Sequence, residues 1–220
     1  MIERLKKIRR KLLRHFKMRP IHKVINLLRK HDYLVMNNTL EVFGYNGEYH
    51  TLDYIEHVKN LSIWEIAKDC EESLRKNLPF ANVKITNSFE EIKTTNIIFD
   101  TIIVDNHQGI FGDDKCEHFE IIKDCFLKLS DKSVLIVNII PNILDSKYDT
   151  PKEVTDKHIE RRKSFYSHQT GTLITKSYFE DFYIKMANEN GFTTKHVFIV
   201  KRNYLMSYLV LCLEKKKVKG

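Results

Sequence analysis

The feature that most constrains this sequence is a regular alternation between short apolar runs and segments with helical spacing, from about residue 38 to residue 213. The runs Phe99–Val104 and Ser133–Ile140 are predominantly apolar, which is typical of strands that are covered on both faces. Helical segments follow these runs, and Gly191 marks the end of the last one. This alternation predicts an α/β fold with a mostly parallel sheet and helices on both faces.

Seven strands are predicted, and the last two form a hairpin. We expect strands at 39–43, 61–66, 83–86, 99–104, 133–140, 196–201 and 206–213. We expect helices at 21–31, 51–58, 68–77, 89–93, 116–129, 152–165 and 176–189. A short turn at Asn203 separates the last two strands, so these should form an antiparallel hairpin at the edge of the sheet.

The formal net charge of +8 belongs to one end of the chain. Residues 1–30 contain 12 Lys and Arg and one acid, whereas the other 190 residues contain 25 bases and 28 acids. Apolar residues recur at helical spacing from Ile2 to Phe16, which predicts a basic amphipathic helix that ends or bends at Pro20. We therefore divide the chain into a basic N-terminal helical extension at 1–33 and one domain at 34–220, with an insertion at about 141–175.

The basic segment 1–19 has the composition of a helix that binds an anionic surface. A membrane surface attracts each cation by on the order of 1 kcal/mol, and the phosphates of nucleic acid attract the same side chains. We favour a membrane surface, or docking on the domain, over nucleic acid, because no aromatic residues alternate with the cations and the domain is slightly acidic. A helix that only improves solubility is the alternative.

Several classes of protein are excluded by the composition. No apolar run is long enough to cross a bilayer, and the charged N-terminus does not resemble a signal peptide. The four cysteines form no CxxC pair, which argues against a zinc site or a disulfide framework, and we predict no metal. We expect a cytoplasmic protein that contacts the inner face of a membrane at most peripherally.

A turn with two glycines follows the first predicted strand, in Leu40-Glu41-Val42-Phe43-Gly44-Tyr45-Asn46-Gly47. Glycine permits a sharp turn and a close approach of the backbone to a ligand. Some eighteen residues beyond this turn, Glu65 ends the second predicted strand, where a carboxylate can accept hydrogen bonds from both hydroxyls of a ribose. An ordinary turn and a solvent-exposed glutamate would explain the same residues.

The order of strands and helices, the turn and Glu65 together resemble the class I S-adenosylmethionine-dependent methyltransferases, over about residues 34–213. The resemblance implies a Rossmann-like fold in which the cofactor lies at the carboxyl ends of the strands. The cofactor contacts that it implies are Glu41, Phe43, Gly44, Tyr45, Asn46, Gly47, Glu65, Ile66, Asn87, Ser88 and Asp105. Tyr45 stands where the family has its middle glycine, which leaves open an inactive relative. Ser88 is alternatively the N-cap of the following helix.

The polar segment Asp105-Asn106-His107-Gln108 follows the fourth predicted strand, where the family places residues beside the reactive methyl group. The resemblance implies that Asp105 faces the sulfonium end of the cofactor and that Asn106 and Gln108 line the substrate. His107 is our candidate base, because histidine has a pKa near neutrality without any shift. A solvated loop histidine is the alternative.

The insertion contains four further candidates. We predict that Arg161 and Arg162 bind an anionic substrate and that Tyr166 and His168 assist proton transfer. Insertions at this point of the fold extend over the carboxyl ends of the central strands. A solvent-exposed helix of mixed charge is the alternative.

We therefore predict a methyltransferase that uses S-adenosylmethionine to methylate an oxygen of a small molecule or of a sugar-containing precursor. Asp105, His107, Tyr166 and His168 would lie at its reaction centre. One alternative is a non-catalytic Rossmann-like module that binds a nucleotide or a partner protein. Another is an aminopropyltransferase of the spermidine synthase type, which Asp105, Asp113 and Asp114 match only in part.

Overall fold

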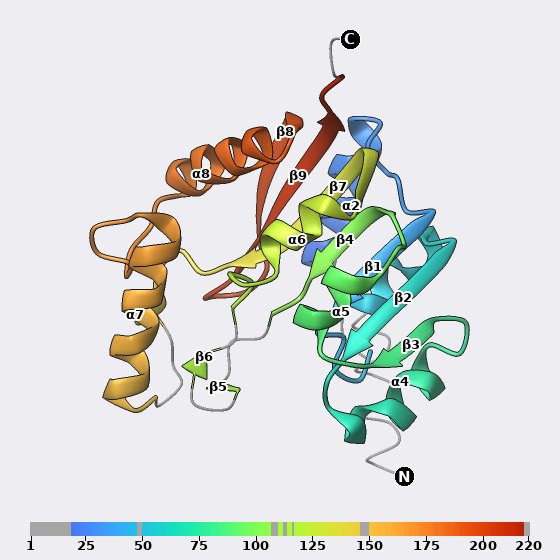
Figure 1. The fold of residues 1–220 in the computed structure, drawn as a ribbon, viewed down its shortest axis with the longest axis horizontal. Helices are drawn as coiled ribbons and strands as arrows, with labels where there is room; N and C mark the ends of the chain where they lie inside the picture. Colours follow the sequence, from blue (N-terminus) through green and yellow to red (C-terminus); the bar gives the residue numbers. More distant parts are fainter. Residues whose placement is uncertain are drawn as a thin grey trace.

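A sheet of seven strands forms the centre of the computed structural model, which describes residues 19–47, 50–106, 110–111, 114–115, 117–145 and 150–217 (Figure 1). The strand order is β3-β2-β1-β4-β7-β9-β8. The strands are β1 (Asn38–Val42), β2 (Asn60–Glu65), β3 (Asn82–Ile85), β4 (Phe99–Val104), β7 (Leu129–Ile139), β8 (Phe192–Lys201) and β9 (Ser207–Lys215). The predicted α/β class and the mostly parallel sheet are confirmed.

The last strand of the chain, β9, lies inside the sheet, between β7 and β8. The pairs from β3 to β7 are parallel, whereas β9 is antiparallel to both of its neighbours, β7 and β8. The predicted hairpin is therefore confirmed, with β8 at the edge and β9 inside the sheet. Its turn, which contains Arg202 and Asn203, lies at the carboxyl ends of the parallel strands.

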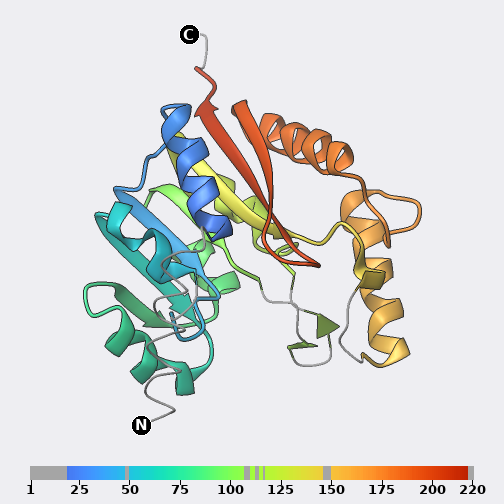
Figure 2. The same cartoon turned by 180° about the vertical axis from the view of Figure 1, so that it is seen from behind.

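Helices cover both faces of the sheet, as the sequence predicted (Figures 1 and 2). One face carries α2 (Pro20–Lys30), α3 (Thr51–Tyr54), the 3-10 turns η1 (Ile55–His57) and η2 (Lys68–Cys70), and α4 (Glu71–Asn77). The other face carries α5 (Ser88–Thr94), α6 (Ile122–Leu127) and α8 (Lys176–Glu189). Beyond the carboxyl ends of the strands lie α7 (Lys152–Tyr166), the 3-10 turn η3 (Ile143–Asp145) and the small hairpin of β5 (Ile110–Phe111) and β6 (Asp114–Lys115).

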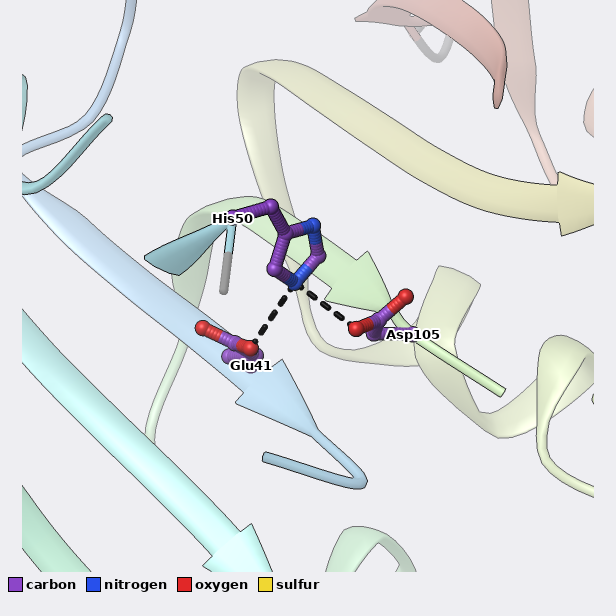
Figure 3. A group of neighbouring side chains, drawn as sticks. All are labelled: Glu41, His50 and Asp105. Carbon is purple, nitrogen blue, oxygen red and sulfur yellow. Dashed lines mark hydrogen bonds and ion pairs between the residues drawn. The ribbon is translucent and has the colours of Figure 1, made fainter. Parts of the chain in front are cut away.

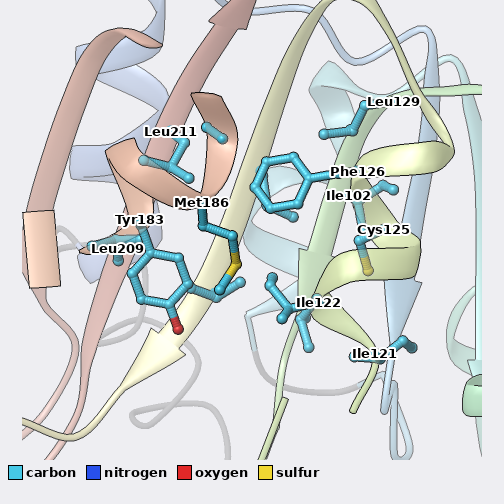
Figure 4. Packing of buried hydrophobic residues seen from close by; sticks show 14 of the residues in the cluster. Ile102, Ile121, Ile122, Cys125, Phe126, Leu129, Tyr183, Met186, Leu209 and Leu211 are labelled. Carbon is cyan, nitrogen blue, oxygen red and sulfur yellow. The ribbon is translucent and has the colours of Figure 1, made fainter. Parts of the chain in front are cut away.

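The alternation of side chains along each strand decides which residues meet these helices. Successive residues point to opposite faces, so Leu209 and Leu211 of β9 share one face and pack towards α6 and α8 (Figure 4). Phe126 of α6 and Tyr183 of α8 belong to the same buried cluster. Each large apolar side chain that is buried in this way stabilises the fold by about 1.5–3 kcal/mol.

Helix α2 belongs to the domain, although the sequence analysis assigned residues 20–33 to the extension. Its residues Ile21, Val24, Ile25 and Leu28 recur at helical spacing and are buried against β4, β7 and β9. Pro20 occupies the start of this helix, where its missing N–H is not needed. The boundary at residue 33 is therefore wrong, because the apolar stripe of α2 completes one face of the core. The predicted basic helix at residues 1–18 lies outside the described residues.

The predicted helix at 116–129 is the largest error in secondary structure. Among the described residues 117–129, only α6 is helical, and Glu117, His118 and Phe119 before it are buried in a turn. The side chains that bury them come from α7 and α8, far along the chain, so local periodicity carries no signal of this turn.

Within the described part of the chain, no helix has the length and apolar character needed to span a membrane.

Candidate active site

The turn after β1 places residues of left-handed backbone at alternate positions. Phe43, Tyr45 and Gly47 have φ angles of 64°, 48° and 69°. Glycine adopts this conformation without steric cost, whereas other residues do so rarely. The structure therefore agrees that Tyr45 stands at a position suited to glycine, and it adds Phe43 as a second such position that the sequence analysis missed.

The two glycines of this turn are required by packing. A Cβ atom on Gly44 would lie 2.3 Å from Ile63 Cγ2, and one on Gly47 would lie 2.6 Å from Leu78 Cδ1. Both missing side chains thus point towards β2 and α4. The turn is pressed onto the domain, which fixes its backbone at the carboxyl edge of the sheet.

Glu65 connects this turn with the end of β2. Its Oε2 accepts a hydrogen bond of 2.7 Å from the Tyr45 amide, and its Oε1 accepts bonds of 2.8 and 2.9 Å from the amides of Ile66 and Ala67. From the sequence, ribose binding is predicted for this carboxylate, which lies at the predicted edge of the sheet. Oε1 uses both of its lone pairs in these bonds, whereas Oε2 can accept one more hydrogen bond.

The region after β3 corrects one predicted role. Asn87, and not Ser88, is the N-cap of α5, because the Asn87 side chain accepts a hydrogen bond of 3.0 Å from the Phe89 amide. Ser88 is buried at the start of the helix. The rings of Phe43 and Phe89 lie 5.8 Å apart, so the turn after β1 and the start of α5 are in contact.

A cluster of charged side chains forms where β1, α3 and β4 meet (Figure 3). Glu41 pairs in register with Ile103, so Asp105, two residues further on, points to the same face of the sheet as Glu41. His50, immediately before α3, lies between the two acids. Its Nε2 is 3.1 Å from Glu41 Oε1 and 2.8 Å from Asp105 Oδ2.

Each member of this cluster has further partners. Glu41 accepts hydrogen bonds from the hydroxyls of Thr51, at 2.8 Å, and Tyr54. Asp105 accepts a bond of 2.6 Å from Asn138 Nδ2 and forms an ion pair with Arg202. His50 Nδ1 lies 3.0 Å from the Tyr208 hydroxyl. We define Glu41, His50, Asp105, Arg202 and Tyr208 as the edge cluster.

The pKa values within the edge cluster follow from burial and from these neighbours. Burial alone would lower the pKa of His50, but the negative charge of Asp105, followed by contributions from Tyr208 and Glu41, raises this pKa well above its usual value. Burial opposes ionisation of Asp105, yet His50 and Arg202 hold its pKa far below the usual range. The two shifts thus favour the ionised form of each group in the presence of the other.

An open pocket of about 390 Å³ lies beside the edge cluster. It is lined by Arg19, Pro20, Ile21, His50, Asp53, Arg202, Asn203 and Tyr208. Arg19 Nη1 and Asp53 Oδ2 form an ion pair of 2.6 Å at its rim. Pockets of a few hundred cubic ångströms are typical of sites for small ligands.

The segment after β4 is only partly described. Asn106, which we predicted to line the substrate, is fully buried and donates a hydrogen bond of 3.3 Å to Glu117 Oε2. That position corrects the prediction, because the side chain faces the interior beneath α7. The candidate base His107 and the candidate substrate residue Gln108 lie outside the described residues.

Arg162 anchors helix α7 to the sheet. Its fully buried guanidinium donates hydrogen bonds of 2.6 and 2.7 Å to the carbonyls of Gly171 and Ile140, and it lies 3.4 Å from Glu117 Oε1. The predicted contact with an anionic substrate is therefore wrong for Arg162, because all three of these partners are protein atoms. Arg161, one residue earlier, pairs with Glu120 and donates a bond of 3.1 Å to the Lys115 carbonyl.

The structure describes the contacts of both residues of the insertion that we predicted to assist proton transfer. Tyr166 is fully buried, and its hydroxyl lies 3.4 Å from that of Tyr183, so it belongs to the core between α7 and α8. His168 follows the end of α7, where its Nδ1 accepts weak bonds of 3.4 Å from the amides of Thr170 and Gly171. Neither side chain reaches the edge cluster in a described contact, which corrects the prediction that they share a reaction centre with Asp105.

Three members of the edge cluster were missed by the sequence analysis. His50, Arg202 and Tyr208 follow no motif and lie outside the segments that the strand ends singled out. The available signal was topological: a hairpin at this edge brings its own turn, with Arg202, next to the carboxyl ends of β1 and β4. Glu41 and Asp105 were predicted at this edge, and the structure brings them together.

We compared the chain with protein-family models, curated proteins and solved structures, and the solved structures identify its fold. No protein-family model matches the chain, and no curated protein matches it in sequence. Solved structures do match, at TM-scores of 0.51–0.53 over most of the chain. The chain has the Rossmann-like fold of the class I S-adenosylmethionine-dependent methyltransferases.

Three of these similar structures are methyltransferases by description. Magnesium protoporphyrin IX methyltransferase (ChlM) from Synechocystis PCC 6803, solved with S-adenosylhomocysteine, is 12% identical over 88% of this chain and 80% of its own, with a TM-score of 0.53. A protein from Sulfolobus solfataricus assigned to the type 11 methyltransferases is 12% identical over 92% and 95%, with a TM-score of 0.53. The plantazolicin methyltransferase BpumL, in complex with S-adenosylhomocysteine, is 14% identical over 82% and 76%, with a TM-score of 0.51.

Proposed function

We propose that this chain is an S-adenosylmethionine-dependent methyltransferase that acts on an oxygen of a small molecule or of a sugar-containing precursor. The observation that carries the proposal is the position of the turn from Phe43 to Gly47 beside the carboxylate of Glu65. Both lie at the carboxyl edge of the sheet, in a fold that is similar to proteins solved with S-adenosylhomocysteine. In parallel α/β sheets, ligands bind at this edge.

The surface around Glu65 suits an adenosyl group. Tyr45 and Ile66 flank Glu65 and are 59% and 42% exposed, which is high for large apolar side chains. They offer apolar surface for a base next to a carboxylate whose Oε2 can accept a hydrogen bond from a ribose hydroxyl. The exposed position of Tyr45 also means that its side chain does not fill the edge, although it stands at a glycine position.

The pocket beside the edge cluster is our proposed acceptor site. Its volume of about 390 Å³ fits a small molecule or a single sugar unit better than a macromolecular surface. The cofactor would supply an electrophilic methyl group, and the protein would orient the acceptor oxygen and remove its proton. His107 remains the proposed base on the strength of its position in the sequence, and Asp105 would organise the edge through its contacts with Asn138 and Arg202.

Calorimetric titration with S-adenosylhomocysteine tests the cofactor assignment. We expect saturable binding to the wild-type chain and binding that is weaker by about 10-fold or more in Glu65→Gln, because hydrogen bonds to a charged acceptor contribute about 1.5–3 kcal/mol. Glu56→Gln is the matched control, since Glu56 is an exposed acid outside this edge. Far-UV circular dichroism checks that each variant folds. Wild-type protein that shows no saturable heat would refute the cofactor assignment.

One observation favours the non-catalytic alternative. Phe43 and Tyr45 carry side chains at two left-handed backbone positions, which glycine adopts without steric cost. If S-adenosylhomocysteine fails to bind while the wild-type fold is intact, a module that binds another nucleotide or a protein is preferred. The aminopropyltransferase alternative loses support, because Asp105 is paired with His50 and Arg202 and is not free to bind a polyamine.

A further inference from the structure

Three ligand-type atoms of the edge cluster converge from different elements. Glu41 Oε1 comes from β1, His50 Nε2 from the residue before α3, and Asp105 Oδ2 from the segment after β4, and all three lie within 4.8 Å of one another (Figure 3). Glu41 and His50 are buried, and Asp105 is half-buried. Within the described residues, this is the one group of three such side chains that meets this distance.

The distances between these atoms match the spacing of neighbouring ligands around a metal ion. Bonds from a metal ion to nitrogen or oxygen are about 2.0–2.2 Å, so ligand atoms at right angles to one another lie about 3 Å apart. His50 Nε2 lies 2.8 Å from Asp105 Oδ2 and 3.1 Å from Glu41 Oε1. Each of these carboxylate oxygens therefore lies at a distance from His50 Nε2 that is expected between two ligands of one ion.

The outer atoms of the three side chains are held by the protein. The Tyr54 hydroxyl donates to Glu41 Oε2, and Asn138 and Arg202 donate to Asp105 Oδ1. The Tyr208 hydroxyl lies 3.0 Å from His50 Nδ1, where it can accept a hydrogen bond and leave the lone pair of Nε2 free. Such supporting hydrogen bonds fix the orientation of metal ligands in proteins.

The local charge favours a cation between the two carboxylates. With a neutral His50, the two acids and Arg202 leave one net negative charge in this buried cluster. A proton on Nε2 would neutralise this negative charge, and a divalent ion in the place of the proton would also be attracted by it. His50 also lines the pocket beside the cluster, which gives an ion a path from solvent.

We propose that Glu41, His50 and Asp105 form a binding site for one divalent transition-metal ion. Two carboxylate oxygens and one imidazole nitrogen suit ions such as Mn²⁺ that accept mixed oxygen and nitrogen ligands. The site would tie the end of β1, the start of α3 and the end of β4 together. This proposal differs from the expectation of no metal, and it stands independently of methyl transfer, since binding of the ion needs no adenosyl cofactor.

Electron paramagnetic resonance of Mn²⁺ added to the chelator-treated full-length protein tests the site. We expect the signal of free Mn²⁺ to fall until one equivalent is bound, and nitrogen modulation from one imidazole in the bound spectrum. His50→Gln and Glu41→Gln should each weaken binding by about 10-fold or more, since each removes one of three protein ligands or its charge. His57→Gln, seven residues from His50 and on the neighbouring 3-10 turn, should bind as the wild type does.

Two results would overturn the proposal. One is an undiminished free Mn²⁺ signal with the folded wild-type protein, which would show that a proton occupies the position between the carboxylates. The other is bound Mn²⁺ without nitrogen modulation, which excludes His50 as a ligand even where the variants fail to fold. Titration with S-adenosylhomocysteine on the same sample separates this outcome from failure of the proposed function.

Discussion

Replacing Gly47 by alanine tests how tightly the turn after β1 is pressed against the domain. Two costs combine at this position. The backbone has a φ of +69°, and a new Cβ atom would lie 2.6 Å from Leu78 Cδ1 and 3.3 Å from Leu74 Cδ2. Both leucines are fully buried in one apolar cluster, so neither can move aside without disturbing its neighbours.

The magnitude follows from adding these costs. An alanine in left-handed backbone is strained by about 1 kcal/mol relative to glycine. Crowding of a packed core adds about 1–3 kcal/mol, so we expect Gly47→Ala to lower the free energy of unfolding by about 2–4 kcal/mol. Gly191 provides the matched control, because its φ is +82° while no atom lies within 4 Å of its Cβ position. Gly191→Ala should therefore lower the free energy of unfolding by only about 1 kcal/mol.

Urea unfolding followed by circular dichroism measures both variants against the wild type. The difference between the two losses isolates the contact with Leu78, since the backbone cost is shared. Equal losses would refute the reasoning, because they would show that the turn has room for a side chain. In that case close packing could not be the reason for glycine at position 47.

Two further predictions concern the interior beneath α7. Arg162→Met should lower the free energy of unfolding by about 3–5 kcal/mol, because it removes the guanidinium that pairs with the buried Glu117 and leaves the carbonyls of Gly171 and Ile140 without this donor. Arg161→Met should lower it by about 1 kcal/mol; similar losses in chemical denaturation would contradict this assignment. Burial lowers the pKa of His118 from 6.5 to about 4. Between these pH values the unfolded chain binds more protons than the folded chain. The free energy of unfolding should therefore fall by up to about 3 kcal/mol as the pH decreases through this range. Between pH 7.5 and pH 5, the free energy of unfolding of His118→Gln should therefore decrease by about 2 kcal/mol less than that of the wild type. An equal decrease in both proteins would exclude His118 as the titrating group.

Much of the fold followed from the sequence where local pattern and final environment agree. Strand β4 and helix α8 match their predicted bounds, because a buried run and a long helical period each identify one structure. The predicted helix at 116–129 failed for the opposite reason. Glu117 and His118 are buried by contacts with α7 and α8, and polar residues in a turn give no local sign of such partners.

The candidate site was predicted in its location and only in part in its members. Glu41, Glu65 and Asp105 end parallel strands, and strand ends meet at one edge in any sheet of this kind. Arg202 lies 97 residues from Asp105, and only the insertion of β9 between β7 and β8 brings it there. Arg161 and Arg162 carry the same charge, yet one helical step separates a surface pair from a buried anchor, which the weakly amphipathic sequence of α7 does not reveal.

The place of β9 inside the sheet has a consequence for synthesis of the protein. While residues 207–215 are still to be added, β8 has no neighbour with which to pair, and β7 presents an open edge to other chains. Glu41, His50 and Asp105 are also synthesised well before Tyr208, whose hydroxyl supports the imidazole of His50 in the complete fold. Ribosome-bound intermediates of this protein should therefore need protection at β7, and the edge cluster is completed among the final events of folding.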